Sequence, residues 1–510
     1  MMDWVEGLKY VSDPYIMLFL LTGVVGGGII GALPGLTATM GVAILTPLTF
    51  WFEPTMGFAM LIGVYNSAIF AGGISAILIN TPGTPASIAS TFDGYALYRQ
   101  GKGGLALGIN VIYSALGGLI GCLVLIFLSF PLARFTVTFG PPEYFALAFF
   151  GLTMMIAVSG NSLIKGLLVG MAGILISTIG IDPIAMVKRF TFNNVNLLDG
   201  ILFLPTMIGM FGIGEVLNQI YEHRKSVEEA ENAAKREHLS LGRVLPTWAE
   251  FKSCFLMTKM AAIIGVIVGA VPAAGGDIAS IISWGQARRL SKHPELYGKG
   301  SIEGLAVSTI SNNSSIGGAL TTMLTLGIPG DAVTAVLIGS LMMYGMQPGS
   351  KIFTDHRPFV INIMLLMILA NLAFLVLGLL TAKASAKVMN VNKRTVWSSV
   401  AVLCVVGSFA INGSFWDVGV MFFAAILGFL FKRCGFVPGP FILGLLLGGM
   451  LEGNLRRSLV MSQGSGFAIF FMRPVSCILV SITILTLIWP IFKPWIKGKK
   501  VQADADSNAT

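Results

Sequence analysis

Long apolar stretches separated by short polar ones run along the whole chain. Almost uncharged windows cover 15–33, 143–158, 200–219, 361–382, 399–412 and 475–492. Longer apolar blocks cover 36–80, 104–133, 163–180, 255–285, 304–346 and 415–451. A helix needs about 20 apolar residues to cross a hydrocarbon core of about 30 Å. The pattern therefore predicts an all-α polytopic membrane protein with roughly 10 to 12 membrane segments, broken ones included.

Composition agrees with a chain that resides in a lipid bilayer. Of 510 residues, 55% are hydrophobic and 11% are charged, and the mean hydropathy is +0.82. Soluble domains carry about 25% charged residues. The net charge of +9 gathers in polar stretches at 221–253, 288–299 and 493–500. The positive-inside rule assigns these stretches to the cytoplasm, so no nucleic-acid partner is needed to explain them.

One long polar stretch divides the chain. We predict a first membrane half at 1–220, a polar cytoplasmic connecting segment at 221–253, a second membrane half at 254–492 and a cytoplasmic tail at 493–510. If both flanks of 255–285 face the cytoplasm, that segment enters and leaves on one side. It is then a re-entrant hairpin or a pair of short helices that turns at Pro272, Gly275 and Gly276, because proline lacks a backbone donor and glycine allows a sharp turn.

The two halves share a pattern of broken apolar segments. Asn66-Ser67 lies 16 positions before Pro82-Gly83 (82 − 66), and Asn313-Ser314 lies 16 positions before Pro329-Gly330 (329 − 313). Upstream, the "GALPG" of Gly31, Pro34 and Gly35 has an echo in "GAVPA" at 269–273. We predict two pseudo-symmetric, inverted repeats, an arrangement in which interrupted helices form the binding site of a secondary transporter. Cations follow both breaks, at 99–102 and at 351–357, so the sequence leaves the inversion open.

The breaks carry groups that suit a small anion. A helix that begins inside the membrane offers free amides and a partial positive charge. Nearby hydroxyl and amide side chains add hydrogen-bonding groups without fixed charge. The predicted substrate-binding residues are Asn66, Ser67, Asn80, Thr81, Pro82, Gly83, Thr84, Asn313, Ser314, Ser315, Pro329 and Gly330. The alternative is that Pro-Gly only kinks the helix and the hydroxyls bond to carbonyls of the preceding turn.

Two acids flank the breaks of the second half. Acids at membrane depth are costly and are found at proton or cation sites. We expect Asp277 and Asp331, with Thr325, to couple transport to a cation such as transient Na⁺, or to H⁺. The alternative is that Asp331 and Asp277 only cap the helices that follow them.

Enzyme chemistry is not expected. The chain has no Walker sequence, zinc signature or nucleophile elbow. The five cysteines are isolated, and the four histidines lie in polar loops, so neither a metal site nor a cofactor is predicted.

Four stretches of the chain are long and specific enough to compare with known families: "GGIIGALPGLTATMGVAILTPLTF", "GGISAILINTPGTPASIASTFDGYALYRQGKGGLALG", "EGLAVSTISNNSSIGGALTTMLTLGIPGDAVTAVLIGSLMMYGMQPG" and "FGIGEVL". They closely resemble the large membrane subunit of the tripartite tricarboxylate transporters, the TctA family. The family's signature positions fall on Gly31, Pro34 and Gly35, on 80–85, on 312–315 and on 327–331. The second half departs from the pattern at "GAVPAAGGDIAS", where "PG" is more usual, which leaves the symmetry of the two inner tips in doubt.

The resemblance implies a permease subunit in the bacterial inner membrane. Its implied partners are a small four-span membrane subunit and a periplasmic solute-binding protein. The implied substrate is an organic anion such as citrate, taken up by symport with Na⁺ or H⁺, and the implied fold is similar to elevator-type transporters. The alternative function is a stand-alone carrier or channel for a small anion, without a binding protein.

Overall fold

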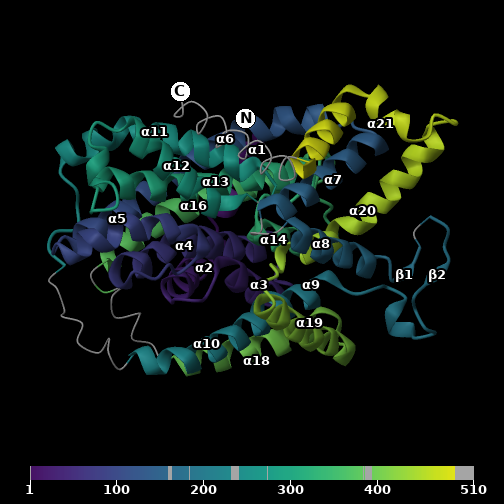
Figure 1. The fold of residues 1–510 in the computed structure, drawn as a ribbon, viewed down its shortest axis with the longest axis horizontal. Coiled ribbons are helices and arrows are strands. Elements are labelled where there is room, and N and C mark those ends of the chain that lie inside the picture. Colours follow the sequence, from purple (N-terminus) through teal and green to yellow (C-terminus); the bar gives the residue numbers. More distant parts are fainter. Residues whose placement is uncertain are drawn as a thin grey trace, which may run out of the picture. The chain divides into compact units, whose positions relative to one another are not determined.

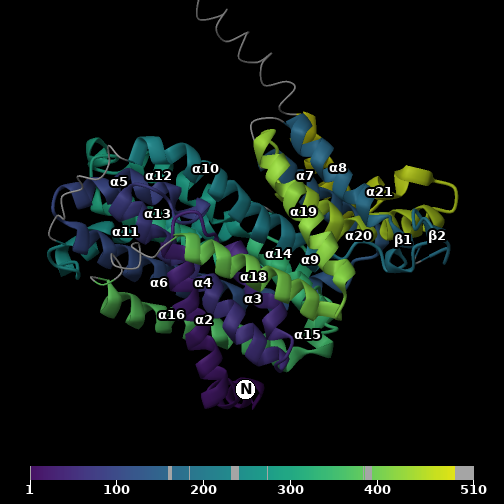
Figure 2. The ribbon, with the colours of Figure 1, turned by 90° about the horizontal axis from the view of Figure 1, so that it is seen from below.

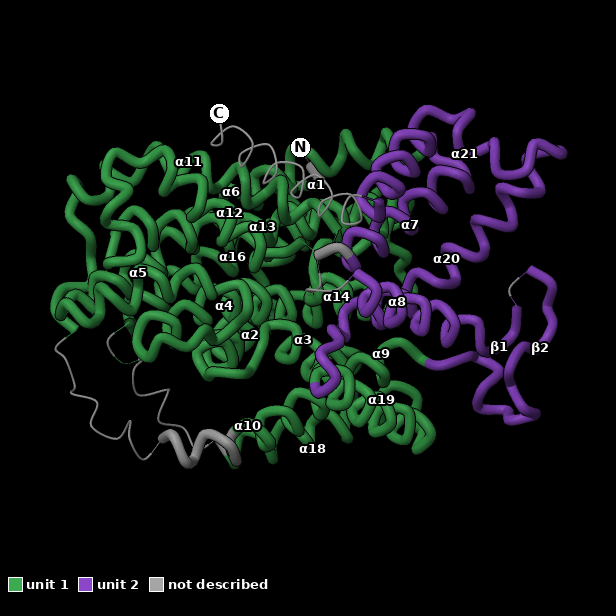
Figure 3. Tube along the Cα trace, viewed as in Figure 1, with its two compact units in different colours: residues 1–137, 202–432 green, residues 138–201, 433–510 purple. Residues whose placement is uncertain are grey.

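The computed structural model describes residues 2–158, 163–182, 184–230, 241–272, 274–382, 384 and 393–488. Helices make up most of this part of the chain, and its strands form one short antiparallel ribbon (Figure 1). Two compact units result: unit 1 contains Met1–Val137 and Leu202–Lys432, and unit 2 contains Thr138–Ile201 and Arg433–Thr510 (Figure 3).

The elements of unit 1 are α1 (Met2–Val11), α2 (Pro14–Ala32), α3 (Ala38–Thr49), α4 (Pro54–Ile79), η1 (Pro85–Ser87), α5 (Ile88–Arg99), α6 (Gly103–Thr136), α9 (Phe203–Met207), the π-helix η3 (Ile208–Ile213), α10 (Gly214–Ala230), α11 (Trp248–Ala270), α12 (Gly275–Leu290), η4 (Pro294–Leu296), α13 (Ile302–Leu326), α14 (Ala332–Met343), α15 (Ile352–Asp355), α16 (Arg357–Thr381), α18 (Lys393–Asn412) and α19 (Phe415–Arg433). The elements of unit 2 are α7 (Pro141–Val158), α8 (Leu163–Ser177), β1 (Gly180–Ile181), β2 (Lys188–Arg189), η2 (Val195–Leu197), α20 (Gly439–Met461), η5 (Gly466–Ala468) and α21 (Ile469–Met472), with a further helical stretch at Pro474–Ile488.

The described helices confirm an all-α polytopic membrane protein. Seven are long and apolar enough to cross a membrane, and an eighth span results if Gly466–Met472 and Pro474–Ile488, bent by 103°, count as one. Three shorter apolar helices, α3, α8 and α14, are further candidates for partial spans. The count of 10 to 12 segments included such broken pieces.

Two long helices, α4 and α13, form the centre of unit 1. Every residue of α13 from Gly304 to Thr325 is buried, as are nearly all residues of α4. Residues next to each N-terminus explain where the two helices begin. Pro54 is the first residue of α4, a position where the missing amide hydrogen costs nothing. The Ser301 hydroxyl caps α13 by accepting a hydrogen bond from Gly304 N at 3.0 Å. Helices α2, α6, α11 and α16 pack around this pair, and α10 and α18 lie side by side at one face of the unit (Figures 1 and 2).

Small residues let the surrounding helices touch the central pair. On α2, a Cβ added to Gly27 or Gly31 would overlap the backbone of Val64 or Ala68 on α4. On α11, a Cβ added to Gly265 or Gly269 would overlap the backbone of Ser311 or Ser315 on α13. Close approach through glycines spaced four apart is a usual way for membrane helices to associate, because lipid supplies no hydrophobic drive between them.

Two helices meet at a turn within 255–285, as predicted, and the first of them, α11, is itself long enough to cross a membrane. Helices α11 and α12 pack against each other, and both pack against α13. Thr247 and Glu250 form the capping box that starts α11. The sidedness of this hairpin in a membrane stays a prediction.

The loops that follow the two breaks lie at opposite ends of α6. At its N-terminal end, Gly104 N donates to Leu241 O and Gln100 Nε2 donates to Lys299 O at 2.8 Å. At its C-terminal end, Arg134 lines one cavity with Ser350 and Arg357. The 34 residues of α6 are about 50 Å long at 1.5 Å per residue. An inverted repeat requires this separation, and the inversion itself stays a prediction.

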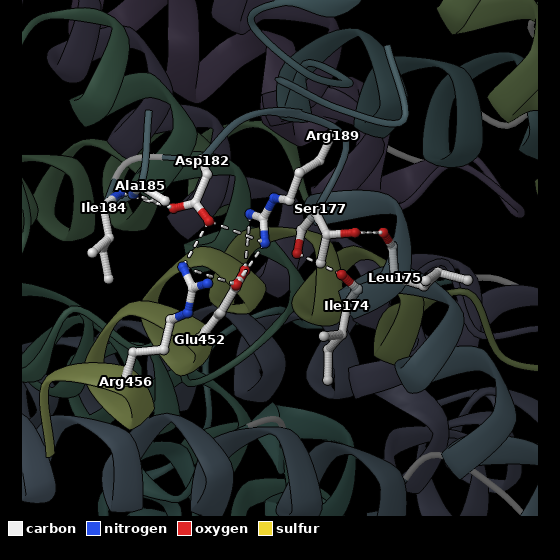
Figure 4. A network of polar contacts seen from close by, with 10 residues as sticks. Ile174, Leu175, Ser177, Asp182, Ile184, Ala185, Arg189, Glu452 and Arg456 are labelled. Atoms are coloured by element: carbon white, nitrogen blue, oxygen red, sulfur yellow. Dashed lines mark hydrogen bonds and ion pairs between the residues drawn. The ribbon is translucent and has the colours of Figure 1, made fainter. Parts of the chain in front are cut away.

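Unit 2 is built around α20, which packs on α7 and α8. Again glycines allow the approach, because a Cβ on Gly173 would overlap the backbone of Phe441. Beyond the end of α8, residues 178–201 carry the β1–β2 ribbon, and an ionic network ties this segment to α20 (Figure 4). Glu452 accepts two hydrogen bonds from Arg189, at 2.6 and 3.1 Å, and the buried carboxylate of Asp182 accepts from Arg456 Nη1 at 2.7 Å.

The predicted division of the chain stays a prediction. Each compact unit combines stretches from both sides of the 221–253 segment, since packing groups the helices by contact rather than by chain order. Residues 231–240 of that segment and the predicted tail at 493–510 lie outside the described residues.

Candidate transport site

The first break follows α4. Helix α4 ends at Asn80, which adopts the left-handed conformation (φ 56°, ψ 30°), and η1 begins at Pro85. Asn80 and Thr81 are exposed, Pro82 is half-buried, and Gly83 and Thr84 are buried. The chain folds back along α4, so that Gly83 N donates to Gly72 O at 3.1 Å.

The second break follows α13 and has the same form. Helix α13 ends at Gly327 in the left-handed conformation (φ 71°, ψ 20°), and Asp331 is the N-cap of α14. Its Oδ1 accepts from Thr334 N at 2.8 Å, and Thr334 Oγ1 accepts in turn from Asp331 N at 2.9 Å. The capping interpretation of Asp331 is therefore confirmed. For Asp277 it is wrong, because Ala274 is the N-cap of α12 and Asp277 is an exposed residue of the first turn.

The two breaks make equivalent contacts. A Cβ on Gly83 would overlap Gly31 O and Gly72, whereas a Cβ on Gly330 would overlap Gly269 O and Ala319. Gly83 and Gly330 are separated by 247 positions (330 − 83), as are Gly72 and Ala319 (319 − 72). Gly31 and Gly269 are the first glycines of the two echoing motifs. Each break thus lies against the end of the helix that carries the motif of its own half.

The Asn-Ser pairs also make equivalent contacts, and these hold helices together. Ser67 Oγ donates to Val24 O on α2 at 2.6 Å, and Ser314 Oγ donates to Ala262 O on α11 at 3.0 Å. The predicted substrate-binding hydroxyls of this pair are therefore engaged in helix packing. Their role in binding stays a prediction.

The two asparagines of these pairs lie in the core of unit 1. Asn66 accepts from Asn371 Nδ2 at 3.2 Å, and Asn313 Nδ2 donates to Ser114 Oγ at 2.9 Å. The carbonyl oxygens of Asn313 and Asn371 are buried and have no partner in the protein. Such atoms are usually satisfied by water or an ion in a native protein.

Tyr65, just before the first Asn-Ser pair, contacts the break of the other half. Tyr65 OH donates to Asp331 Oδ2 at 2.5 Å. The equivalent positions in the other half are Asn312 and Thr84, displaced by the same 247 positions (312 − 65 and 331 − 84). Asn312 Oδ1 and Thr84 Oγ1 are both buried and both lack a partner in the protein. Tyr65 and Asp331 are therefore joined by a hydrogen bond, whereas Asn312 Oδ1 and Thr84 Oγ1, at the two equivalent positions, form none within the protein.

The tip of α12 lies between the two breaks. A Cβ on Gly275 would lie 3.3 Å from Asp331 Cβ, and Ser280 Oγ donates to Ala86 O of η1 at 3.2 Å. A Cβ on Gly276 would overlap Asn312 Oδ1. The second break therefore contacts the first turn of α12, and the segment after the first break contacts its second turn; that the breaks form one site stays a prediction.

Other predicted residues have local roles. Ser315 Oγ donates to Asn312 O at 2.6 Å and Thr325 Oγ1 donates to Thr321 O at 2.6 Å, so both hydroxyls bond within α13. Gly35, with φ 90°, ends the turn after Pro34, and its carbonyl accepts from Gln219 Nε2. Pro272 is buried at the α11–α12 turn. The amides of Gly83 and Asp331 are bonded within the protein, so the predicted free amides at these two positions are not observed.

The predicted substrate-binding residues included neither Tyr65 nor Asn312. Tyr65 lies inside an apolar run and gives no motif of its own. Its signal was positional, because it immediately precedes an Asn-Ser pair, as Asn312 does in the second half.

Comparison with known proteins decides the family. A sequence model described as the tripartite tricarboxylate transporter TctA family matches residues 17–443. The chain belongs to the TctA family. An uncharacterized 52.8 kDa protein from the TAR-I ttuC′ 3′ region of Agrobacterium vitis is 32% identical over 507 residues, which is 98% of each chain.

A second Agrobacterium vitis relative of this TctA chain, an uncharacterized protein from the TAR-II ttuC′ 3′ region, is 30% identical over 238 residues. That match covers 47% of this chain and 98% of the relative. No solved structure matches the chain. Membership of the TctA family makes the chain a permease of the tricarboxylate transporter class and points to a transporter rather than an enzyme.

Proposed function

We propose that this TctA chain is the permease subunit of a binding-protein-dependent secondary transporter. It takes up a di- or tricarboxylate, a citrate-like organic anion, across the bacterial inner membrane. A gradient of Na⁺ or H⁺ drives uptake, and a small membrane subunit and a periplasmic solute-binding protein assist. The observation that carries the proposal is the pair of matched breaks, which contact the first two turns of α12 through Asp331 and Ala86, inside a chain of this family.

Two unpartnered atoms, Thr84 Oγ1 at the first break and Asn312 Oδ1 beside Gly276 of α12, supply polar contacts of the proposed site. A buried oxygen without a partner costs about 1–3 kcal/mol. Thr84 Oγ1 can donate to a substrate carboxylate, and Asn312 Oδ1 can bind a cation or a substrate hydroxyl. Both atoms gain a partner only when substrate or cation is bound, so binding recovers part of the desolvation penalty that these atoms carry in the empty site.

The acids explain the need for a coupling cation. Asp277 and Asp331 approach each other around Gly275, and a substrate with two or three carboxylates adds like charge. Like charges at short range repel one another. A proton or Na⁺ at these acids offsets that repulsion, so anion and cation bind together. Symport follows from this mutual dependence.

Uptake of radiolabelled citrate into proteoliposomes that hold the chain, its small subunit and the binding protein tests the proposal. An imposed Na⁺ or H⁺ gradient should drive accumulation, and Asp331→Asn should abolish it. Uptake that needs no binding protein would favour the stand-alone carrier or channel instead. Failure of every gradient and every di- or tricarboxylate in wild-type vesicles would refute the function.

A further inference from the structure

The segment that follows α8 in unit 2 exposes large apolar side chains outside the long helices (Figure 3). Met186, Phe190, Phe192 and Val195 are 76%, 56%, 85% and 76% exposed. Lys188 lies among them and is exposed as well. Contact of such side chains with water is unfavourable, so a group of this size indicates contact with a partner or with a membrane.

The backbone of this segment adopts an unfavourable conformation at several of these residues. Four of the six non-glycine residues with positive φ in the described part of the chain lie at 186–193, among them Met186 (φ 54°), Phe190 (φ 52°) and Phe192 (φ 46°). The left-handed region is unfavourable for residues that have a Cβ, so local preference does not explain this backbone. Contacts with the rest of unit 2 must impose it, and strain of this kind is found at functional sites.

The contacts that hold the segment come from α20. The buried carboxylate of Asp182 accepts from Arg456 Nη1, and Glu452 accepts two hydrogen bonds from Arg189 (Figure 4). Each acid of this network is therefore paired with an arginine. Paired charges tolerate a medium of lower dielectric constant than water far better than single charges do.

Backbone donors around the turn are satisfied within the segment. Asp182 N donates to Val187 O and Met186 N donates to Asp182 O, both at 2.9 Å. The Asp182 carboxylate accepts in addition from the amides of Ile184 and Ala185, at 2.8 and 3.1 Å. Lipid offers no partner to a backbone amide, so internal hydrogen bonds are what non-helical chain requires at the edge of a bilayer.

The lengths of α8 and α20 place this segment about one hydrocarbon core away from the other charged end of unit 2. The two helices run parallel, because the contact at Phe441 is followed, further along both helices, by that of Ser177 with Gly448. Twelve residues of α8 from Lys165 to Ser177 (177 − 165) and eight of α20 from Gly448 to Arg456 (456 − 448) together rise about 30 Å. That distance matches the hydrocarbon thickness of about 30 Å.

An exposed apolar stripe on α8 leads to the segment. Ile164, Leu168, Met171 and Leu175 follow one another at spacings of three and four residues, and all four are exposed. This spacing gathers side chains on one helix face, the face that a membrane helix turns toward lipid. Helix α8 has 15 residues and is about 22 Å long, so it ends short of a full crossing. The apolar residues at 186–195 continue its exposed surface along the chain.

We propose that residues 184–195 anchor unit 2 in the membrane–water interface and that the lipid bilayer covers their apolar side chains. Segments of this kind bury apolar groups about 5–10 Å into the boundary between headgroups and acyl chains. The Lys188 stem can extend along this surface and bring its ammonium to lipid phosphates. The anchor supplies the part of the crossing that α8 lacks. It does not depend on which substrate is transported.

A fluorescent reporter shows whether lipid or water surrounds the segment in the full chain. Phe192→Cys carries bimane in a background where Cys434→Ser and Cys477→Ser remove the native thiols that are not buried. The labelled chain is placed in phosphatidylcholine nanodiscs whose lipids carry bromine near the headgroup or near the chain ends, and iodide is the aqueous quencher. Met171→Cys on α8 is the lipid control, and Lys102→Cys, an exposed position of a polar loop, is the aqueous control.

Bimane at position 192 should be quenched more by shallow bromine than by deep bromine, and severalfold less by iodide than bimane at position 102. A second reporter at Val195→Cys tests the role of the phenyl groups. Phe190→Ser combined with Phe192→Ser should weaken bromine quenching at 195 and strengthen iodide quenching, because the apolar groups that hold the segment in the interface are gone. Phe190→Leu combined with Phe192→Leu is the matched control and should keep the wild-type pattern.

Three results would overturn the anchor. The first is iodide quenching at 192 and 195 as strong as at 102, with no effect of bromine. The second is protection from both quenchers, because a second copy of the chain or another subunit would then cover the segment in place of lipid. The third is unchanged quenching at 195 in the serine pair, since the phenyl groups would then not hold the segment in the interface.

Discussion

The phenolic hydroxyl of Tyr65 donates a hydrogen bond of 2.5 Å to Asp331 Oδ2, joining α4 of the first half to the break of the second. The other oxygen of the same carboxylate caps α14 by accepting from Thr334 N. The Asp331 side chain therefore has two roles, the contact with Tyr65 and the cap of α14, and substitution can separate them because only the contact with Tyr65 involves the first half of the chain.

Asp331→Asn should abolish gradient-driven uptake while leaving the fold intact. Asparagine is as good an N-cap as aspartate, so α14 keeps its start, but the negative charge that would hold a coupling cation is gone. Asp331→Ala should lose uptake and also destabilise the protein by about 1 kcal/mol through the lost cap. Proteoliposome uptake and thermal unfolding in detergent measure the two effects separately. If Asp331→Asn transports normally, the residue serves only as a cap.

Thr84→Val should stabilise the empty protein and weaken transport. Thr84 Oγ1 is buried without a partner, and replacing such a hydroxyl by a methyl group of similar shape removes a desolvation penalty of about 1–3 kcal/mol. The loaded state would lose the contact that the hydroxyl makes. The measurement is the thermal midpoint with and without citrate, together with the half-saturating citrate concentration for uptake.

Thr46→Val is the matched control, because the Thr46 hydroxyl is buried but already bonded to Val42 O at 2.8 Å. It should not stabilise the protein, since it removes a made hydrogen bond, and it should not change half-saturation. A Thr84→Val variant with unaltered uptake would remove Thr84 from the site.

How far the sequence predicts this molecule depends on the kind of signal. Apolar run length predicts helices well, because crossing a hydrocarbon core demands a minimum length, and the Pro-Gly pairs mark both breaks at Gly83 and Gly330. The direction of a polar side chain has no such marker. Ser67 and Tyr65 are two positions apart on α4, yet the Ser67 hydroxyl bonds to α2 and the Tyr65 hydroxyl bonds to Asp331. The rotation of α4 about its own axis determines which neighbour each hydroxyl faces, and that rotation cannot be predicted from a single apolar run.

Gly31→Ala should destabilise the protein by about 1–3 kcal/mol, whereas Gly26→Ala should not. A Cβ on Gly31 would overlap the backbone of Ala68, and overpacking of this kind forces helices apart. Gly26 lies on the same helix with nothing within 4 Å of an added Cβ. Alanine there only improves helix propensity. Thermal unfolding of both variants in detergent decides; equal midpoints would show that α2 and α4 do not pack as described.

The Asp182 network should resist all but strongly acidic conditions. Hydrogen bonds from the amides of Ile184 and Ala185, and then from Arg456, hold the pKa of the Asp182 carboxyl well below its usual range. A carboxyl whose pKa is depressed by folding stabilises the folded state above its unfolded pKa of about 3.9, and that stability is lost as the pH falls toward the folded pKa. Hydrogen exchange at the two amides should therefore show constant protection from pH 8 down to about 4. In Asp182→Asn, protection should be lower throughout and should not change with acid; loss of protection near pH 6 in the wild type would contradict the network.

Labelling from opposite sides of the membrane should distinguish Lys102→Cys from Lys351→Cys. These residues follow the first and second breaks, and they lie toward opposite ends of α6, whose 34 residues exceed the thickness of a hydrocarbon core of about 30 Å. In a background with Cys434→Ser and Cys477→Ser, a membrane-impermeant maleimide added to intact cells should react with position 351 and not with 102. Inside-out vesicles should reverse the pattern. Reaction of both positions from one side would rule out inverted repeats and would place the Arg134–Arg357 cavity on the same face as the loop after the first break.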